Sequence, residues 1–298
     1  MESTQKKTVV VFGATGAQGS SVAHALLDDG TFQVRAVTRN PSQPAAQALL
    51  KRGAEVVKGD LHNLTTLEEI MAGAYGAFVV TTFSHDFNKE EESRQGKNTA
   101  EAAKGQGLKH VVFSGLDHVE KLTGGRLKVP YFDSKGEAEA RYQELGVPFT
   151  SVRMPVYFEN FFNYNRPLKE PGKNAYTLAI PMGDTPLHAM SVSDLGIIVL
   201  NIFKAPVVYI GKLINLSVEA LTVRRYAHIL SQCLGKDIQD AKISVEAYEQ
   251  LAPKPVADMF RYLQLKTNYD QTTTHQLNPR AKSFQQWVEE NKPKFEDL

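Results

Sequence analysis

Cysteine is almost absent from this chain, which has only Cys233 among its 298 residues. A lone cysteine excludes an internal disulfide, and it excludes a zinc site made of several thiolates. We expect Cys233 to lie in a core as a small apolar side chain, with a redox-sensing thiol as the alternative. Packing and hydrogen bonds, rather than cross-links, therefore have to stabilise the fold.

Long apolar runs and an excess of charge are also absent. No stretch reaches the about 18 apolar residues that a membrane-spanning helix requires, and the N-terminal MESTQKK leads into a β-type run without a signal-peptide segment. The 34 basic and 33 acidic side chains leave a formal net charge of +1, which provides no electrostatic footprint for nucleic acid or an anionic membrane. We therefore expect a cytoplasmic protein that binds neither directly.

The first half of the chain alternates short β-branched runs with longer amphipathic stretches. Six short runs predict buried strands, at residues 8–12, 34–38, 54–60, 77–82, 110–115 and 149–154. Five stretches between them predict helices, at residues 20–28, 45–52, 65–72, 90–105 and 135–145. This alternation predicts an α/β fold with a Rossmann-type doubly wound parallel sheet over residues 1–153.

The alternation ends after Arg153, and residues 154–298 predict a smaller C-terminal α/β portion that closes over the ligand crevice. The segment 165–176 contains Pro and Gly and predicts a surface loop. Ser193 or Asp194 is expected to cap an apolar helix that Pro206 ends. Further elements are expected as a strand at 212–217 and as helices at 222–234 and 283–291, the last of which packs Trp287 into a core.

Three glycines, Gly13, Gly16 and Gly19, follow the first predicted strand in the pattern G-x-x-G-x-x-G and open the first predicted helix. Such a turn lets the backbone approach a pyrophosphate, whose charge meets the free N–H groups at the helix N-terminus. The spacing also occurs in turns that bind no ligand, but here it lies within one βαβ unit, which is the context that a dinucleotide site requires. The motif therefore predicts dinucleotide binding.

The residue about 20 positions beyond such a motif meets the adenosine ribose. An NAD site has Asp or Glu there, whereas this chain has Arg39 in the sequence VTRNPSQ, with no acid within reach. A guanidinium fits a 2′-phosphate through paired, charge-assisted hydrogen bonds. We therefore prefer NADP(H), with a solvated surface arginine as the alternative.

Two further groups follow strands whose carboxyl ends are expected to border the crevice. Asp60 and Leu61 follow the third predicted strand and would frame the adenine, although Asp60 could instead cap the helix after it. The residues TTF at 81–83 end the fourth predicted strand and would pass beneath the cofactor.

Five segments are characteristic in combination: VVVFGATGAQGSSVA, VTRNP, YFDSKGEAE, SVRMPVYFEN and MSVSDLG. With these motifs the chain resembles the NmrA-like family of atypical short-chain dehydrogenase/reductases, and particularly an animal member that senses NADPH. The similarity runs nearly end to end. It implies a Rossmann-type fold that binds NADP(H), often without turnover, and that reports the NADPH/NADP ratio by changing its conformation, oligomeric state or partners.

The resemblance also implies where ligands and partners bind. A protein partner is expected to contact roughly residues 155–190, the chain is expected to form a homodimer, and the nucleus is a second expected location beside the cytoplasm. Carried over by position, the cofactor contacts fall on Gly13, Ala14, Thr15, Gly16, Ala17, Gln18, Arg39, Asn40, Pro41, Ser42, Gln43, Thr81, Thr82, Phe83, Arg94, Lys135, Tyr157, Phe158, Glu159 and Asn160. The glycine motif and the expected strand ends add Gly19, Asp60 and Leu61 to this set.

The chain departs from the regulatory members of the family, which are described as lacking the tyrosine of a Y-x-x-x-K motif. Here Tyr131 and Lys135 stand in YFDSK, one turn apart on a helix that starts near Tyr131. In the reductase mechanism the lysine bonds the nicotinamide ribose and makes the tyrosine more acidic, and the phenol exchanges a proton with the substrate. Ser114, at the end of the fifth predicted strand, would polarise the substrate carbonyl. In the alternative, Pro130 bends the tyrosine away and Lys135 is only a ribose contact.

These observations leave three classes of function. The first is an NADP(H)-binding sensor, the second is an NADPH-dependent reductase of a small carbonyl or quinone, and the third is a purely structural interaction module. A metal enzyme is not among them, because His110, His118 and His188 show no metal-ligand spacing and are expected on the surface or in loops.

Overall fold

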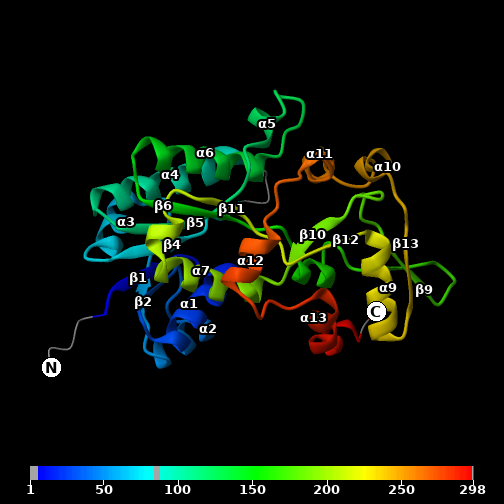
Figure 1. Cartoon of the computed structure of the whole chain (residues 1–298), viewed down its shortest axis with the longest axis horizontal. Helices are drawn as coiled ribbons and strands as arrows, with labels where there is room; N and C mark the ends of the chain where they lie inside the picture. Colours follow the sequence, from blue (N-terminus) through cyan, green and yellow to red (C-terminus); the bar gives the residue numbers. More distant parts are fainter. Residues whose placement is uncertain (1–5, 84–87, 297) are drawn as a thin grey trace. The chain divides into compact units, whose positions relative to one another are not determined.

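The structure is a computed structural model that describes residues 6–83, 88–296 and 298 (Figure 1). The chain divides into two compact units. Unit 1 comprises Met1–His118, Pro130–Arg153 and Ser193–Ile214, and unit 2 comprises Val119–Val129, Met154–Val192 and Asn215–Leu298. The expected boundary after Arg153 is one place where the chain passes between the units, but 119–129 and 193–214 do not follow it. The division into domains 1–153 and 154–298 therefore stays a prediction.

The strands of unit 1 are β1 (Thr8–Val11), β2 (Gln33–Thr38), β3 (Glu55–Lys58), β4 (Gly76–Val79), β5 (His110–Gly115), β6 (Phe149–Arg153) and β11 (Leu213–Asn215). They form a seven-stranded sheet in the order β11-β6-β5-β4-β1-β2-β3, and neighbours among β1 to β6 are parallel. The strand order reverses between β1 and β4, and open α/β sheets bind ligands at the carboxyl ends of such a switch point. The predicted doubly wound α/β fold is confirmed.

The helices that cover this sheet are α1 (Ala17–Asp29), α2 (Pro44–Lys51), α3 (Leu64–Met71), α4 (Lys89–Gly105), α6 (Pro130–Glu144) and α7 (Leu195–Lys204), and the short α8 (Pro206–Tyr209) follows α7. Figure 1 shows α3, α4 and α6 on one face and α1, α2 and α7 on the other. Helix α6 begins five residues before the predicted start, with Pro130 at its first position. Proline is tolerated there because an N–H at this position would have no acceptor within the helix. Tyr131 therefore lies inside the helix.

The core of unit 1 lies between the sheet and the helices α3, α4 and α6. Val10, Val79 and Phe113 contribute buried side chains from the strands. A Cβ built on Gly96 would lie 2.2 Å from the Cβ of Ala138, so the backbones of α4 and α6 approach closely there. This close packing positions the side chains that α4 and α6 bring together at one end of the sheet.

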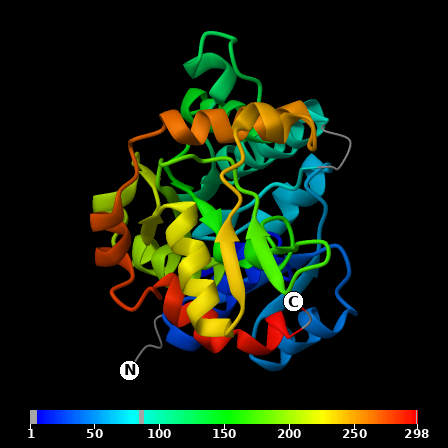
Figure 2. The ribbon, with the colours of Figure 1, turned by 90° about the vertical axis from the view of Figure 1, so that its right-hand side faces the viewer.

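Unit 2 contains two three-stranded sheets. One consists of β12 (Glu219–Leu221), β10 (Leu187–Met190) and β7 (Val156–Tyr157), and the other of β13 (Asp237–Asp240), β9 (Ala175–Leu178) and β8 (Leu168–Lys169). The helices of unit 2 are α5 (Val119–Leu122), α9 (Val223–Leu234), α10 (Val245–Glu249), α11 (Lys254–Leu265), α12 (Gln271–Leu277) and α13 (Phe284–Glu290). Figure 2 shows α9 beside β13 and β9.

The core of unit 2 is rich in aromatic side chains. Trp287 is 3% exposed and packs with Phe158 and Phe284, as predicted for a residue of the last helix. Cys233 is half-buried against this core, and burial raises the pKa of its thiol. A raised pKa lowers the thiolate fraction, so the environment favours the apolar interpretation of Cys233 over a reactive thiol.

One prediction for the C-terminal half is wrong, and two others are confirmed. The expected loop 165–176 instead contains β8 and the start of β9, which pair antiparallel with Leu168 opposite Thr177. Gly172, with a φ of 72°, accommodates the left-handed backbone of the turn between them. Asp194 occupies the N-cap position of α7 as predicted, although its side chain makes no capping hydrogen bond, and α7 ends just before Pro206, which opens α8. The strand predicted at 212–217 is confirmed as β11, which lies at the edge of the seven-stranded sheet.

The short pairing between β8 and β9 explains why the sequence did not predict this antiparallel hairpin. Only two residues of β8 pair with β9, and polar residues surround the turn, so the alternation that predicts a strand is too brief to be recognised.

Among the helices of the described residues, none is long and apolar enough to cross a membrane.

Candidate cofactor site

The turn between β1 and α1 requires glycine at two positions. Gly13 has a φ of 61°, a backbone conformation that L-residues rarely adopt. A Cβ built on Gly19 would lie 2.1 Å from the carbonyl oxygen of Gly13, so the helix start and the turn are in direct backbone contact. The N–H of Gly16 donates to that same carbonyl at 2.8 Å. The glycine spacing therefore builds a compact turn whose outer surface is exposed backbone.

The N-terminus of α1 follows this turn and is not capped by a side chain. Gly16 is the N-cap residue, and no side-chain hydrogen bond is made to the first turn from it. The first N–H groups of a helix have no partner within the helix, and the helix dipole adds partial positive charge there. Gly13, Gly16 and Ala17 are exposed, so this end of α1 is accessible to an anion.

The loop after β2 is joined to the glycine turn by side-chain hydrogen bonds. The amide of Gln43 donates to the hydroxyls of Thr15 and Thr38, each at 2.9 Å. Within the loop, the N–H of Ser42 donates to the side-chain oxygen of Asn40 at 3.1 Å. Arg39 and Asn40 are exposed, and residues 38–43 contain no carboxylate. The structure thus brings the predicted residues Thr15, Arg39 and Gln43 into one region.

Asp60 lies near this loop but does not cap the helix after it. Asn63 caps α3 by accepting from the N–H of Thr66, so the capping alternative for Asp60 is wrong. Asp60 instead accepts from the N–H of His62 at 3.0 Å and contacts its ring. Hydrogen bonds from the backbone and side chain of His62, together with the positive charge of Arg39, lower the pKa of the Asp60 carboxyl. Leu61 is half-buried beside it.

The predicted lysine of the Y-x-x-x-K motif is held at the carboxyl end of β4. The ammonium of Lys135 donates to the hydroxyl of Thr81 at 2.8 Å and lies 3.0 Å from the carboxylate of Glu92. Thr81 in turn donates to the same carboxylate at 2.7 Å, and Ser134 donates to its other oxygen. Glu92 is 1% exposed and the side chain of Lys135 is 12% exposed, so a buried carboxylate and a largely covered ammonium form one connected pair.

Tyr131 reaches the same region through its ring. The rings of Phe83 and Tyr131 lie 5.6 Å apart in an edge-to-face arrangement. Next to Phe83, the N–H of Thr82 donates to the side-chain oxygen of Gln95 at 2.9 Å. Pro130 therefore does not bend the ring of Tyr131 away from Phe83. The catalytic role of Tyr131, and the alternative in which Lys135 is only a ribose contact, stay predictions.

Glu92 and Gln95 take part in this region although sequence reasoning did not single them out. They stand in the strongly polar run KEEESRQGKN, which resembles a solvated helix face. Both are nevertheless buried on α4. The only signal available was their spacing of three, which places both side chains on the same face of a helix.

Ser114 and Arg94 belong to β5 and α4 of unit 1. Ser114 is 2% exposed on β5, where it stands opposite Val152 of β6. Arg94 is exposed on α4 and lines a surface groove with Glu137 and Arg141 of α6. The roles expected for Ser114 in catalysis and for Arg94 in cofactor binding stay predictions.

The four residues from Tyr157 to Asn160 belong to unit 2. Phe158 is fully buried in the aromatic core, so its side chain serves packing. Glu159 accepts from the hydroxyl of Ser191 at 2.6 Å and from the N–H of Val192 at 3.0 Å. A contact of this segment with a cofactor stays a prediction.

The histidines are more buried than expected. His110 is fully buried in β5, bonds Thr150 at 2.8 Å, and has its pKa lowered to about 4 by burial. His188 is half-buried in β10 beside Ser217, and burial lowers its pKa as well. The expectation that these two lie on the surface or in loops is wrong, because each belongs to a strand. The Nδ1 atom of His118 lies 3.2 Å from a carboxylate oxygen of Asp133.

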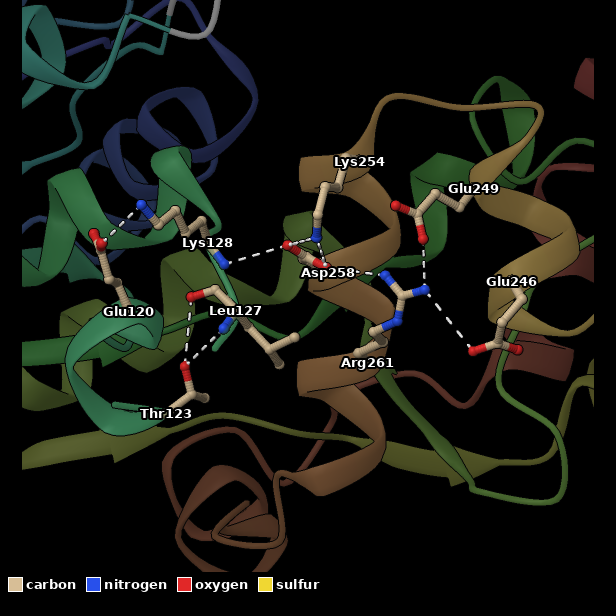
Figure 3. A network of polar contacts seen from close by, with 9 residues as sticks. All are labelled: Glu120, Thr123, Leu127, Lys128, Glu246, Glu249, Lys254, Asp258 and Arg261. Carbon is tan, nitrogen blue, oxygen red and sulfur yellow. Dashed lines mark hydrogen bonds and ion pairs between the residues drawn. The ribbon is translucent and has the colours of Figure 1, made fainter. Parts of the chain in front are cut away.

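Unit 2 contains a separate polar network, which is shown in Figure 3. Asp258 is 2% exposed and accepts from the N–H of Lys128 at 3.3 Å, from Lys254 at 2.7 Å and from Arg261 at 2.9 Å. Arg261 also donates to Glu249 at 2.6 Å. A cavity of about 660 Å³ beside this network is lined by residues that include Arg126, Leu127, Lys242, Val245, Arg261 and Gln264.

The sheet order and the glycine turn define a Rossmann-type α/β protein. The sequence profile of the NmrA-like family matches residues 5–293, and the chain belongs to this family. It is 35% identical over 240 residues to an NmrA-like family domain-containing protein of Dictyostelium discoideum, which covers 78% of this chain and 79% of that protein. It is 34% identical over 250 residues to the NmrA-like family domain-containing oxidoreductase malD of Malbranchea aurantiaca, which covers 78% and 74%.

A solved structure supports the same fold. Nmra, a negative transcriptional regulator whose structure was solved in complex with NADP, matches with a TM-score of 0.81 over 98% of this chain and 97% of that chain. The identity of 22% restricts this likeness to the fold.

Proposed function

We propose that this chain binds NADP(H) in unit 1, in preference to NAD(H). The proposal rests on the loop after β2, which Gln43 holds against the glycine turn and which presents the exposed Arg39. An NAD site requires a carboxylate at this place, and residues 38–43 have none. The regulator Nmra was solved in complex with NADP and also with NAD, which supports dinucleotide binding, and the preference for NADP(H) rests on Arg39 and the missing carboxylate.

The residues present fit the parts of the cofactor. The glycine turn packs directly against the start of α1 at Gly19, and the start of α1, which no side chain caps, offers N–H groups to a pyrophosphate. The guanidinium of Arg39 would bind the 2′-phosphate, and the ammonium of Lys135 would donate to a ribose hydroxyl. When bound, the cofactor supplies a hydride to donate or accept.

The cofactor preference can be measured by calorimetric titration of the purified protein with NADPH and with NADH. We expect NADPH to bind more tightly by about 10-fold or more, because a hydrogen bond to a charged group contributes about 1.5–3 kcal/mol. Equal affinity for the two cofactors would contradict the proposal.

We further propose that the protein is a redox sensor that responds to the NADPH/NADP ratio. Membership in the NmrA-like family and the likeness to a transcriptional regulator support this role. A ligand shifts a conformational or oligomeric equilibrium only when it binds one state more tightly than the other. The homodimer, a protein partner at roughly 155–190, and the cytoplasmic and nuclear locations are parts of this proposal.

Small-angle scattering of the protein with and without saturating NADPH tests the sensor role. We expect a change in mass or in radius of gyration between the two samples. Identical mass and shape in both would leave cofactor binding intact but would rule out this sensor mechanism.

A second candidate function is reduction of a small carbonyl or quinone. The observation that favours it is the presence of Tyr131 and Lys135 on one helix, with both side chains in contact with the segment 81–83. The relative named as an oxidoreductase supports it as well. In this function the phenol of Tyr131 would transfer a proton to the substrate oxygen, while Ser114 would polarise the carbonyl.

A further inference from the structure

A buried carboxylate accompanies the lysine of the proposed cofactor site. Glu92 of α4 is 1% exposed, and its oxygens lie within hydrogen-bond distance of Lys135, Thr81 and Ser134. A buried carboxylate is costly unless it is paired and fully hydrogen-bonded. Here three donors satisfy it, two from α6 and one from the segment that follows β4, which makes Glu92 part of a defined arrangement.

This arrangement restrains the ammonium of Lys135. An ammonium has three N–H donors, and Glu92 and the hydroxyl of Thr81 accept from it at 3.0 and 2.8 Å. The lysine side chain is 12% exposed, so the long stem is also packed. A flexible lysine loses side-chain entropy on binding a ligand, and prior restraint removes much of that cost.

The restrained ammonium lies at the end of the sheet that carries the glycine turn. Strands β1 and β4 are neighbours, with Val11 opposite Phe78. A Cβ built on Gly13 would lie 3.0 Å from the side chain of Val80, the residue directly before Thr81. Thr81 therefore connects the lysine to the immediate surroundings of the glycine turn.

Three acidic groups of α6, the helix that carries Lys135, are bound to different partners. Glu137 pairs with Lys89 and accepts from Ser93, Glu139 pairs with Arg153, and Asp133 lies beside His118. Among the described residues, Glu92 is the acid that pairs with Lys135. The charge of the lysine is thus offset by one identified carboxylate.

We infer that Glu92 is a positioning residue for Lys135, and that it sets the lysine for recognition of the ribose next to the nicotinamide. This inference rests on the proposed function. It assigns Glu92 no direct contact with the cofactor. It predicts that loss of Glu92 weakens binding of the nicotinamide half of NADPH and leaves binding of the adenosine half unchanged.

The test compares two ligands, NADPH and 2′,5′-ADP, which has the 2′-phosphate but neither the nicotinamide nor its ribose. Calorimetric titration is done on wild type, Glu92→Gln, Lys135→Met and the double variant. Glutamine keeps the shape and an acceptor oxygen while it removes the charge. Glu90→Gln is the matched control, because Glu90 is an exposed acid on the same helix. Circular dichroism and the Tm of each variant show whether it folds.

We expect Glu92→Gln to lower the affinity for NADPH by about 10- to 100-fold, since charge-assisted hydrogen bonds are lost. The affinity for 2′,5′-ADP should change by less than about twofold. We expect the double variant to bind NADPH like Lys135→Met alone, because Glu92 acts through the lysine. If Glu92→Gln does not fold, Thr81→Val removes the bridging hydroxyl and is expected to show the same selectivity for NADPH over 2′,5′-ADP.

Equal weakening of both ligands by Glu92→Gln would show a merely structural role and overturn the inference. Wild-type affinity of that variant for NADPH would also overturn it. Failure of the wild-type protein to bind either ligand is a different result, because it contradicts the proposed function itself.

Discussion

The side-chain amide of Gln43 donates a hydrogen bond of 2.9 Å to the hydroxyl of Thr15, which joins the loop after β2 to the glycine turn. This contact ties a turn suited to a pyrophosphate to a loop suited to a 2′-phosphate. Both parts of the predicted site are therefore fixed relative to each other within unit 1.

Replacement of Arg39 tests the cofactor preference. We expect Arg39→Ala to lower the affinity for NADPH by about 10- to 100-fold and to leave the affinity for NADH unchanged, because only NADPH has the 2′-phosphate. Calorimetry with both cofactors measures the change. Lys51→Ala, which removes an exposed cation from the end of α2, is the control and should alter neither affinity. A loss of NADH affinity equal to that of NADPH would show that Arg39 does not recognise the phosphate.

Replacement of Gly19 tests the close approach of the turn and α1. A Cβ at Gly19 would lie 2.1 Å from the Gly13 carbonyl oxygen, whereas one at Gly16 would lie 3.4 Å from it, an ordinary contact. We expect Gly19→Ala to lower the free energy of unfolding by about 1–3 kcal/mol through overpacking and to abolish NADPH binding. Gly16→Ala should lower the free energy of unfolding much less. Urea unfolding followed by circular dichroism compares them, and equal stability of the two variants would contradict the described turn.

The phenol of Tyr131 distinguishes a reductase from a sensor. The measurement is NADPH oxidation with a panel of quinones, aldehydes and ketones. If the wild type turns over any of them, Tyr131→Phe should lower kcat by about 100- to 10,000-fold, because the proton donor is removed. NADPH affinity should hold, and Tyr164→Phe, at an exposed tyrosine, should leave the rate unchanged. A wild type that binds NADPH but oxidises it with none of the panel would support the sensor.

The Asp258 network predicts a dependence of stability on pH (Figure 3). Burial alone would raise the pKa of Asp258, but hydrogen bonds from Lys254, from the N–H of Lys128 and from Arg261 outweigh it and lower the pKa. A carboxyl with a depressed pKa in the folded state stabilises the protein above its unfolded pKa of about 4, and this contribution is lost as the pH falls further.

We therefore expect the free energy of unfolding to decline below about pH 4, and Asp258→Asn to reduce that decline. At pH 7 the same variant should destabilise unit 2 by about 1–3 kcal/mol, because the cationic donors lose their charged acceptor. Asp237→Asn, at an exposed aspartate of β13, is the control. Chemical unfolding from pH 3 to pH 7 makes the comparison, and an unchanged pH slope in Asp258→Asn would contradict the assignment.

Much of unit 1 could be predicted because its signals are local. Each buried strand is a short β-branched run, and the glycine turn has its spacing within seven consecutive residues, Gly13 to Gly19. The missing acid after β2 is equally local, so the sequence also indicated which cofactor to consider. Pairing across the chain was not local. The edge strand β11 pairs with β6 although about sixty residues separate the two strands in the sequence. No pattern within Leu213–Asn215 predicts that β6 is its neighbour.

The sequence by itself determined the α/β alternation, the glycine turn, the carboxylate-free loop at Arg39 and the one-turn spacing of Tyr131 and Lys135. Only the tertiary structure decided that Gln43 joins two loops and that Glu92, within a polar run, is buried against Lys135. The physical reason is that a residue's charge and helix face are properties of the local chain. Its burial and its hydrogen-bond partner depend on which other element packs over it, and the packing of α4 against α6 decided that for Glu92.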